Sequence, residues 1–133
     1  MLGISCISWL SKKQPTVATS NCEAEYKAVF MATIECVWLR HLMADLGVGQ
    51  VTANTIYIDS QCTLAVARNL VFHACTKHIE MHYHYVRERL SADEISLAYV
   101  PTHDNLADVF TKALSREKLE AFCKALGLLP FLD

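Results

Sequence analysis

Apolar residues, joined by one threonine, recur at intervals of three and four in the first third of the chain and predict one long helix. The recurring positions are Tyr26, Val29, Phe30, Thr33, Ile34, Val37, Trp38 and Leu42. This spacing places side chains on one face of an α-helix. Ser20 and Glu23 form a capping box at the start, and Gly47 is a stop signal at the end. We therefore expect a helix from Ser20 to about Leu46.

Alternating and β-branched runs predict the strands. Residues 4–10 alternate loosely, and together with residues 15–19 they predict one bent strand or two short ones. Residues 52–59 form a continuous run typical of a buried strand. Residues 95–100 return to a period of two before Pro101 ends them.

Further helices complete the pattern. They are predicted over residues 60–68, 76–90, 106–114 and 116–126. Ser60 caps the first of these helices, residues 69–75 are predicted to be irregular, and Gly127 ends the last helix. Strands alternating with helices predict an α/β fold with crossover connections and a partly parallel sheet.

Composition narrows the class of protein. The 133 residues, 53% of them apolar, predict a single domain spanning residues 1–133, with Trp9 and Trp38 in its core. No apolar run approaches the roughly 18 residues that a membrane span requires. The first residues lack the basic region and cleavage pattern of a signal peptide. We expect a soluble intracellular protein, cytoplasmic or nuclear, with no membrane partner.

Charge and cysteine content exclude further classes. The net charge of −2 argues against strong nonspecific binding of nucleic acid but allows a local basic face. The six cysteines are scattered among small apolar residues, and no Cys-x-x-Cys pair occurs. This pattern predicts reduced cysteines used as small core residues, and argues against a disulfide framework or a zinc ribbon.

Three carboxylates lie where predicted elements begin or end. Glu25 is in the first turns of the long helix, Asp59 ends the strand at 52–59, and Asp108 is in the first turn of a late helix. Mg²⁺ prefers such oxygen ligands, and paired ions activate water for phosphodiester hydrolysis. These acids predict a nuclease-like metal cluster. The alternative is structural: acids favour helix starts electrostatically, and Asp59 would cap the helix that Ser60 opens.

The helix at 76–90 holds three of the six histidines. His78 and His82 are four residues apart and Cys75 precedes them by about one turn, which raises the alternative of zinc. Tetrahedral sites usually show a tighter pattern, and Glu80 is misplaced for a metalloprotease motif. The other interpretation is a solvated or phosphate-facing side. It would be lined by Lys77, His78, His84, Arg87 and Arg89.

A series of motifs in order carries a family resemblance. They are Ile7–Gln14, Thr16–Ala18, Glu23–Tyr26, Trp38–Arg40, Ile58–Gln61, Thr76–Ile79, His84–Glu88, Tyr99–Thr102 and Leu106–Leu114. In this order they resemble the ribonuclease H domain that closes the polyprotein of copia-type long-terminal-repeat retrotransposons. The match covers roughly residues 3 to 127.

The resemblance implies an RNase H-like mixed sheet with flanking helices and cleavage of the RNA strand in RNA–DNA hybrids. It also implies a magnesium site built from four acids, for which manganese can substitute. Glu25 matches the helix glutamate, Asp59 the acid that ends the next strand, and Asp108 the acid of the closing helix. His103 lies in the loop before that helix, where the family has a histidine linked to proton transfer or product release.

The resemblance also implies a nucleic-acid-binding side, because the Thr76–Ile79 motif belongs to a helix near the hybrid. The residues expected to contact the hybrid are Lys77, His78, His84, Arg87 and Lys112.

One family feature has no counterpart in this sequence. The family's first acid lies on its first strand, upstream of the Ile7–Gln14 motif, and no Asp or Glu precedes Glu23. We therefore expect the first strand and most of the second to be missing. Loss of a ligand lowers magnesium affinity, so the isolated chain is expected to be impaired or inactive.

The expected loss of the central first strand would expose sheet edges, which pair readily with other chains. A homodimer or a protein partner that supplies the missing strand is then expected. The alternative function is a domesticated, noncatalytic module that binds protein or nucleic acid on the same scaffold.

Overall fold

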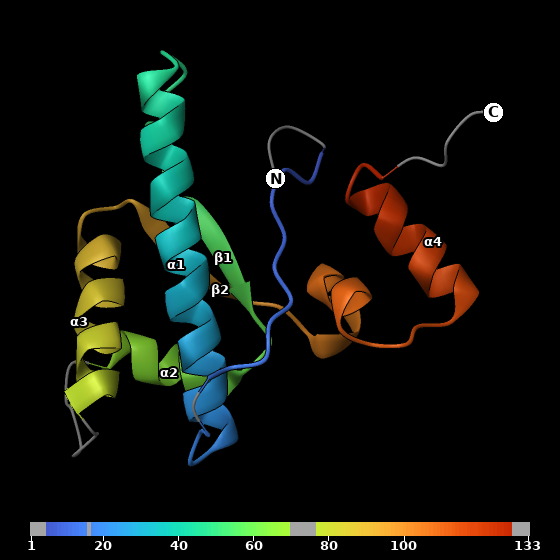
Figure 1. Cartoon of the computed structure of the whole chain (residues 1–133), viewed down its shortest axis with the longest axis horizontal. Coiled ribbons are helices and arrows are strands. Elements are labelled where there is room, and N and C mark those ends of the chain that lie inside the picture. Colours follow the sequence, from blue (N-terminus) through green and yellow to red (C-terminus); the bar gives the residue numbers. More distant parts are fainter. Residues whose placement is uncertain (1–4, 16, 70–76, 129–133) are drawn as a thin grey trace. The chain divides into compact units, whose positions relative to one another are not determined.

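The computed structural model describes residues 5–15, 17–69 and 77–128, with the side chains of residues 77–79 outside that description. Two compact units are present (Figure 1): a larger one, Ala18–Pro101, and a smaller one made of Met1–Val17 with Thr102–Asp133. The single domain over residues 1–133 stays a prediction. Within the described ranges, no helix combines the length and apolarity that crossing a bilayer requires.

The larger unit is built on two parallel strands, β1 (Asn54–Ile58) and β2 (Ile95–Tyr99), with Ile56 opposite Leu97. The connection between them contains α2 (Gln61–Arg68) and α3 (Lys77–Ser91). Both predicted strands and the α/β class are confirmed, but β1 is not the buried strand expected, because Thr55 and Tyr57 on its other face are exposed. Among the described residues the sheet has only these two strands, so the antiparallel part of the expected mixed sheet is not seen.

Helix α1 (Asn21–Asp45) runs against the direction of β1 (Figure 1). The guanidinium of Arg40, near its end, donates to the carbonyls of Thr52 at 2.8 Å and Gln50 at 3.1 Å. It also donates to the side-chain oxygen of Asn54, the first residue of β1. The end of α1 therefore lies beside the start of β1, and the start of α1 lies where β1 ends.

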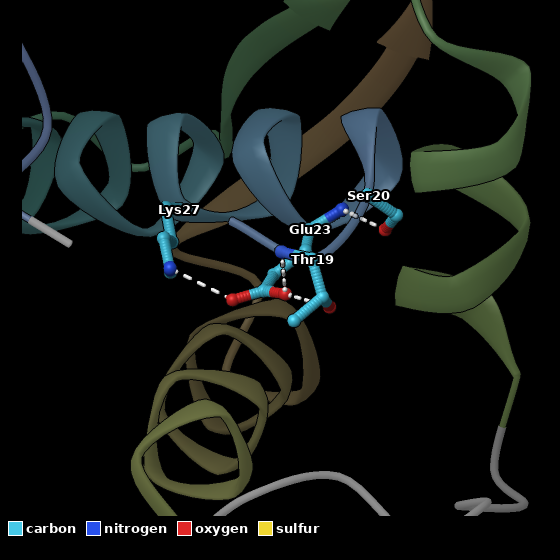
Figure 2. Close-up of polar contacts among 4 residues, drawn as sticks. All are labelled: Thr19, Ser20, Glu23 and Lys27. Atoms are coloured by element: carbon cyan, nitrogen blue, oxygen red, sulfur yellow. Dashed lines mark hydrogen bonds and ion pairs between the residues drawn. The ribbon is translucent and has the colours of Figure 1, made fainter. Parts of the chain in front are cut away.

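The predicted capping box fixes the start of α1 (Figure 2). The Ser20 hydroxyl accepts from the Glu23 N–H at 3.1 Å. The Glu23 carboxylate accepts from the N–H of Thr19 at 2.8 Å and from its hydroxyl, and pairs with the Lys27 ammonium at 2.7 Å. In a capping box the Glu side chain usually accepts from the N–H of the N-cap residue. Here the Glu23 carboxylate accepts instead from the N–H of Thr19, one residue before the N-cap Ser20.

The predicted stop signal is also confirmed. Gly47 has φ +77°, and the N–H of Val48 donates to the Met43 carbonyl at 2.9 Å. This pair of features is a Schellman motif, and the left-handed conformation at its centre favours glycine.

Side chains from all five elements form the core of the larger unit. It consists of Tyr26, Val29, Ile58, Ala67, Tyr83, Val86, Ile95 and Leu97. The rings of Tyr26 and Tyr83 meet with centroids 3.9 Å apart and join α1 to α3. Burial raises the pKa of Tyr26. Thr33 is also buried, and its hydroxyl donates to the Val29 carbonyl at 2.8 Å, which satisfies the polar group.

The core placement predicted for Trp38 is wrong. Its side chain is 56% exposed, whereas Val37 beside it is buried. With about 3.6 residues per turn, Trp38 lies on a different face of α1 from the buried stripe. We call the apolar residues on its face the exposed stripe. It consists of Met31, Ile34, Trp38 and Leu42. The apolar spacing predicted from the sequence therefore combined residues of two faces of α1. Only the face with Tyr26, Val29, Thr33 and Val37 is buried in the larger unit.

The smaller unit contains α4 (Arg116–Ala125), as predicted, with Ser115 as its N-cap and Gly127 at φ +69° after its end. The strand expected in residues 4–10 and 15–19 is wrong, since among the described residues there only Ser5 forms a β-bridge. A β-strand needs hydrogen bonds to a neighbouring strand along its length. Among the described residues of this segment, such pairing occurs only at Ser5. The Cys6 N–H donates to the Leu126 carbonyl at 2.9 Å.

Trp9 is likewise not in the core. Its side chain is 63% exposed and stacks on Phe110 with ring centroids 6.2 Å apart. Phe110 closes η2 (Leu106–Phe110), a 3₁₀ helix that follows η1 (Thr102–Asp104). The helix predicted over residues 106–114 is thus shorter and tighter. Its N–H groups bond three residues back, a geometry that rarely extends beyond a few residues.

Ile95→Ala tests the core. Ile95 is 2% exposed, so its truncation should lower the free energy of unfolding by about 2–5 kcal/mol, measured by urea denaturation. Ile34→Ala, on the exposed stripe, is the matched control and should change it by about 0.5 kcal/mol or less. Equal effects of the two substitutions would contradict this core.

Glu23→Gln tests the cap. The ion pair with Lys27, followed by the hydrogen bonds from Thr19, lowers the pKa of Glu23 from 4.5 to about 2. A lowered carboxyl pKa stabilises the fold above the unfolded pKa, and that contribution is lost as pH falls toward the folded pKa. Wild type should therefore lose stability from about pH 4.5 to 2 more steeply than Glu23→Gln in urea unfolding at each pH. Lys27→Gln should flatten the slope in part, and an unchanged slope in Glu23→Gln would count against the cap.

Candidate functional site

Asp59 directly follows the last residue of β1 and is half-buried. The proposed capping role for Asp59 is wrong, because Ser60 caps α2 with its own hydroxyl. That oxygen accepts from the Thr63 N–H at 3.2 Å and from the Thr63 hydroxyl at 2.9 Å. Among the residues that the structure describes, the Asp59 carboxylate forms no hydrogen bond or ion pair. This carboxylate is therefore available for a ligand at the carboxyl end of a parallel strand.

Glu25 lies in the second turn of α1 and is also half-buried. Its charge reaches Cys22, one turn earlier. Burial and the contact with Cys62 raise the pKa of Cys22, and the negative charge of Glu25 adds to the increase. Glu25 is thus beyond the capping turn, where Glu23 already fills the structural role of an acid at a helix start.

The first turn of α1 contacts the first turn of α2. The Sγ atoms of Cys22 and Cys62 are 2.6 Å apart, and the Thr63 hydroxyl donates to the Cys22 carbonyl at 3.4 Å. Cys22 precedes Glu25 by three residues, and Cys62 follows Asp59 by three. These contacts, together with the reversed direction of α1, place Glu25 and Asp59 at the same end of the larger unit.

Asp108 belongs to the smaller unit. It is 6% exposed, and its Oδ1 lies 2.9 Å from the ammonium of Lys112. Asn105 caps η2 by accepting from the Ala107 N–H at 3.2 Å, so Asp108 is not the cap. His103 is exposed, with Nε2 3.3 Å from Oδ2 of Asp104.

The predicted metal residues are therefore divided between the units, two acids in the larger and one in the smaller. Within the described part of either unit, no three His, Cys, Asp or Glu side chains gather as a metal site. A cluster of Glu25, Asp59 and Asp108 stays a prediction, as does the role of His103.

The expected nucleic-acid-binding side is described in part. The side chains of Lys77 and His78 lie outside the described residues. His84 is exposed, with Nε2 4.0 Å from the Glu80 carboxylate, and Arg87 is half-buried on the same helix. Basic and acidic side chains therefore alternate along α3.

Of the three residues raised for the zinc alternative, the structure describes the side chain of His82. The imidazole of His82 stacks on Phe30 with centroids 3.9 Å apart and planes 16° from parallel. The proposed partner Cys75 and the side chain of His78 lie outside the described residues.

Two features of the larger unit were not predicted from the sequence. One is the set of hydrogen bonds from Arg40 to the residues around the start of β1, although Arg40 belongs to the Trp38–Arg40 motif. The other is the thiol pair. The five described cysteines are free, as predicted, and Cys36 packs against the core. The core placement expected for Cys62 is wrong, because it is exposed, and Cys75 lies outside the described residues.

Comparison with known proteins places the chain among retroelement sequences. It is 38% identical over 127 residues to the retrovirus-related Pol polyprotein from transposon RE1 of Arabidopsis thaliana, covering 96% of this chain. It is 38% identical over 128 residues to the RE2 Pol polyprotein of the same plant, with the same coverage. Identity to the TNT 1-94 Pol polyprotein of Nicotiana tabacum is 39% over 120 residues, or 90% of this chain.

These alignments cover nearly all of this chain but 9% of each relative, so the chain spans a short segment of their length. No family model matches the chain, and no solved structure matches it. The homologues of this chain over nearly all its length are therefore copia-type retrotransposon Pol polyproteins, as its ordered motifs predicted, and the chain corresponds to one short segment of them.

Proposed function

We propose that the chain is the ribonuclease H-type segment of such a Pol polyprotein and hydrolyses the RNA strand of RNA–DNA hybrids with divalent cations, at a measurable but impaired rate because the family's first acid has no counterpart before Glu23. The observation that carries the proposal is the position of Asp59. Its half-buried carboxylate follows a parallel strand, has no protein partner among the described residues, and lies at the same end of the larger unit as Glu25.

The donor chemistry fits Mg²⁺, or Mn²⁺ in its place. Glu25 and Asp59 offer carboxylate oxygens, the ligands that these hard cations take. Such a cation would lower the pKa of a bound water and stabilise the leaving oxygen of a phosphodiester. Asp108 is proposed as the third acid. The Asp108 carboxylate pairs with the Lys112 ammonium at 2.9 Å, and this ion pair would have to open for Asp108 to hold a cation.

Neighbouring residues of the larger unit position Asp59 and Glu25, and His103 of the smaller unit is proposed for proton transfer. Ser60 caps α2 and so leaves Asp59 to the ligand, while Arg40 fixes the other end of α1 against the start of β1. His103 is exposed and carries a titratable ring, which suits the proposed transfer of a proton.

The proposed contacts with the hybrid are electrostatic. His84 and Arg87 on α3, with Lys77, His78 and Lys112, would face phosphates. Since the chain has a net charge of −2 and α3 also carries Glu80 and Glu88, the attraction should be modest and weaken with salt.

Asp59→Asn tests the proposed activity. The full chain is incubated with Mn²⁺ or Mg²⁺ and an end-labelled RNA–DNA hybrid, and RNA cleavage is followed by electrophoresis. The substitution should lower the rate by at least about tenfold, because even groups behind a metal ligand are worth about 10–100-fold. Asp45→Asn, at the opposite end of α1, is the matched control and should retain wild-type activity. Equal rates for wild type and Asp59→Asn, or no cleavage by wild type, would contradict the proposal.

A second function, a noncatalytic binding module, is favoured by the exposed stripe of α1. Met31, Ile34, Trp38 and Leu42 present apolar side chains on one helix face. Exposed apolar groups at helical spacing often mark a docking surface. In addition, β1 and β2 are both edge strands among the described residues, and unpaired edges accept a further strand. We propose a second copy of the chain as the partner, since symmetric dimers are the commonest assemblies.

Trp38→Glu tests this second function. Light scattering coupled to size-exclusion chromatography should show a dimer for wild type and a monomer for the variant, because burying an unpaired carboxylate in an apolar interface is costly. Ala32→Glu is the matched control. Ala32 is exposed on another face of the same helix, so this variant should remain dimeric. A wild-type monomer, or a dimer that Trp38→Glu leaves intact, would contradict the stripe as an interface between copies.

A further inference from the structure

We propose that Cys22 and Cys62 are a redox pair that closes to a disulfide when the chain meets an oxidising low-molecular-weight disulfide such as oxidised glutathione. The inference rests on these two residues alone. It does not depend on cleavage of RNA–DNA hybrids.

The geometry brings the two thiols into contact across distant segments. Their Sγ atoms are 2.6 Å apart, although the residues are 40 positions apart in the chain. A disulfide bond is about 2.0 Å long, so the sulfurs need to approach by roughly 0.6 Å. Both residues lie in first helical turns, Cys22 in α1 and Cys62 in α2. Each turn begins at a serine cap, Ser20 for α1 and Ser60 for α2.

The two thiols differ in access, which sets the order of events. Cys62 is exposed, whereas Cys22 is half-buried. Burial and the contact with Cys62 raise the pKa of Cys22, so Cys22 holds its proton more tightly than an ordinary cysteine. Cys62 is therefore the thiol that an external disulfide reaches first, and Cys22 is the resolving thiol.

The reaction proceeds by thiol–disulfide exchange. The Cys62 thiolate attacks one sulfur of oxidised glutathione, forms a mixed disulfide and releases one glutathione thiolate, which takes up the proton that Cys62 lost. Cys22 then loses its proton and attacks Sγ of Cys62. The mixed disulfide breaks, and the second glutathione leaves with that proton. In total, two protein thiols are oxidised by two electrons, and one small disulfide is reduced to two thiols.

The consequence of closure is local. The disulfide would tie the start of α1 to the start of α2. These are the turns that flank Glu25 and Asp59, each three residues from a cysteine of the pair. Oxidation would therefore fix the spacing between the two helix starts, and reduction would release it.

The sequence allows a clean assay, because the six cysteines fall on six different tryptic peptides. Cys22 lies in residues 14–27 and Cys62 in residues 41–68. The full chain is equilibrated in glutathione buffers of increasing oxidised fraction, quenched by alkylation, digested and measured by mass spectrometry. We expect the peptides 14–27 and 41–68 to become linked, with the intact chain losing about two daltons as two hydrogens are removed.

Two variants complete the test. Cys123→Ser is the matched control and should form the same link as wild type. Cys62→Ser should abolish the link and leave Cys22 without an internal partner. The proposal is overturned if both cysteines remain reduced in every buffer. It is also overturned if each carries its own glutathione without linking, or if either pairs with another cysteine in preference.

Discussion

The reversed direction of α1 relative to β1 is the relation on which the larger unit depends. Arg40 fixes one end of it through hydrogen bonds to Gln50, Thr52 and Asn54, around the start of β1. At the other end, Cys22 meets Cys62 and Thr63. Because helix and strand run in opposite directions, the start of one and the end of the other share a single edge of the unit. That edge holds both Glu25 and Asp59.

Capping explains why these two acids differ from their neighbours. Glu23 and Ser60 satisfy the backbone at the starts of α1 and α2, so their oxygens are committed to local bonds. Asp59 directly precedes Ser60, and Glu25 follows Glu23 by two residues. Acids at helix starts usually serve the helix itself, and here that role is taken by other residues. Position relative to a cap therefore separates a structural acid from a candidate ligand.

Local signals in the sequence predicted most helices and both strands of the larger unit. Ser20, Glu23 and Gly47 set the limits of α1 through bonds within a few residues, and the β-branched run before Asp59 predicted β1. Interactions between distant segments could not be predicted in this way. Trp38 has the right spacing for the core but lies on a face that the described sheet does not bury, and residues 4–10 have strand composition without a strand ladder.

The candidate metal site, like the fold, could be predicted from the sequence only in part. Asp59 was predicted as a metal ligand from its place at the end of a strand and from the motif around it. Glu25 was predicted as a metal ligand from the motif that contains it. The ion pair of Asp108 with Lys112 and the contact between Cys22 and Cys62 depend on geometry that spacing alone does not give. The ordered motifs predicted the family resemblance, and the similarity to the Pol polyproteins confirms that resemblance.

The central claim, that Glu25 and Asp59 act together on one cation, is tested most directly by Mn²⁺ binding to the full chain in a double-mutant cycle. Calorimetric titration would compare wild type, Glu25→Gln, Asp59→Asn and the double variant. The account predicts that each single substitution weakens binding by at least about tenfold and that the double variant loses much less than the sum of the two, since the ligands are coupled. Equal Mn²⁺ affinity in all four proteins, or two losses that simply add, would contradict it.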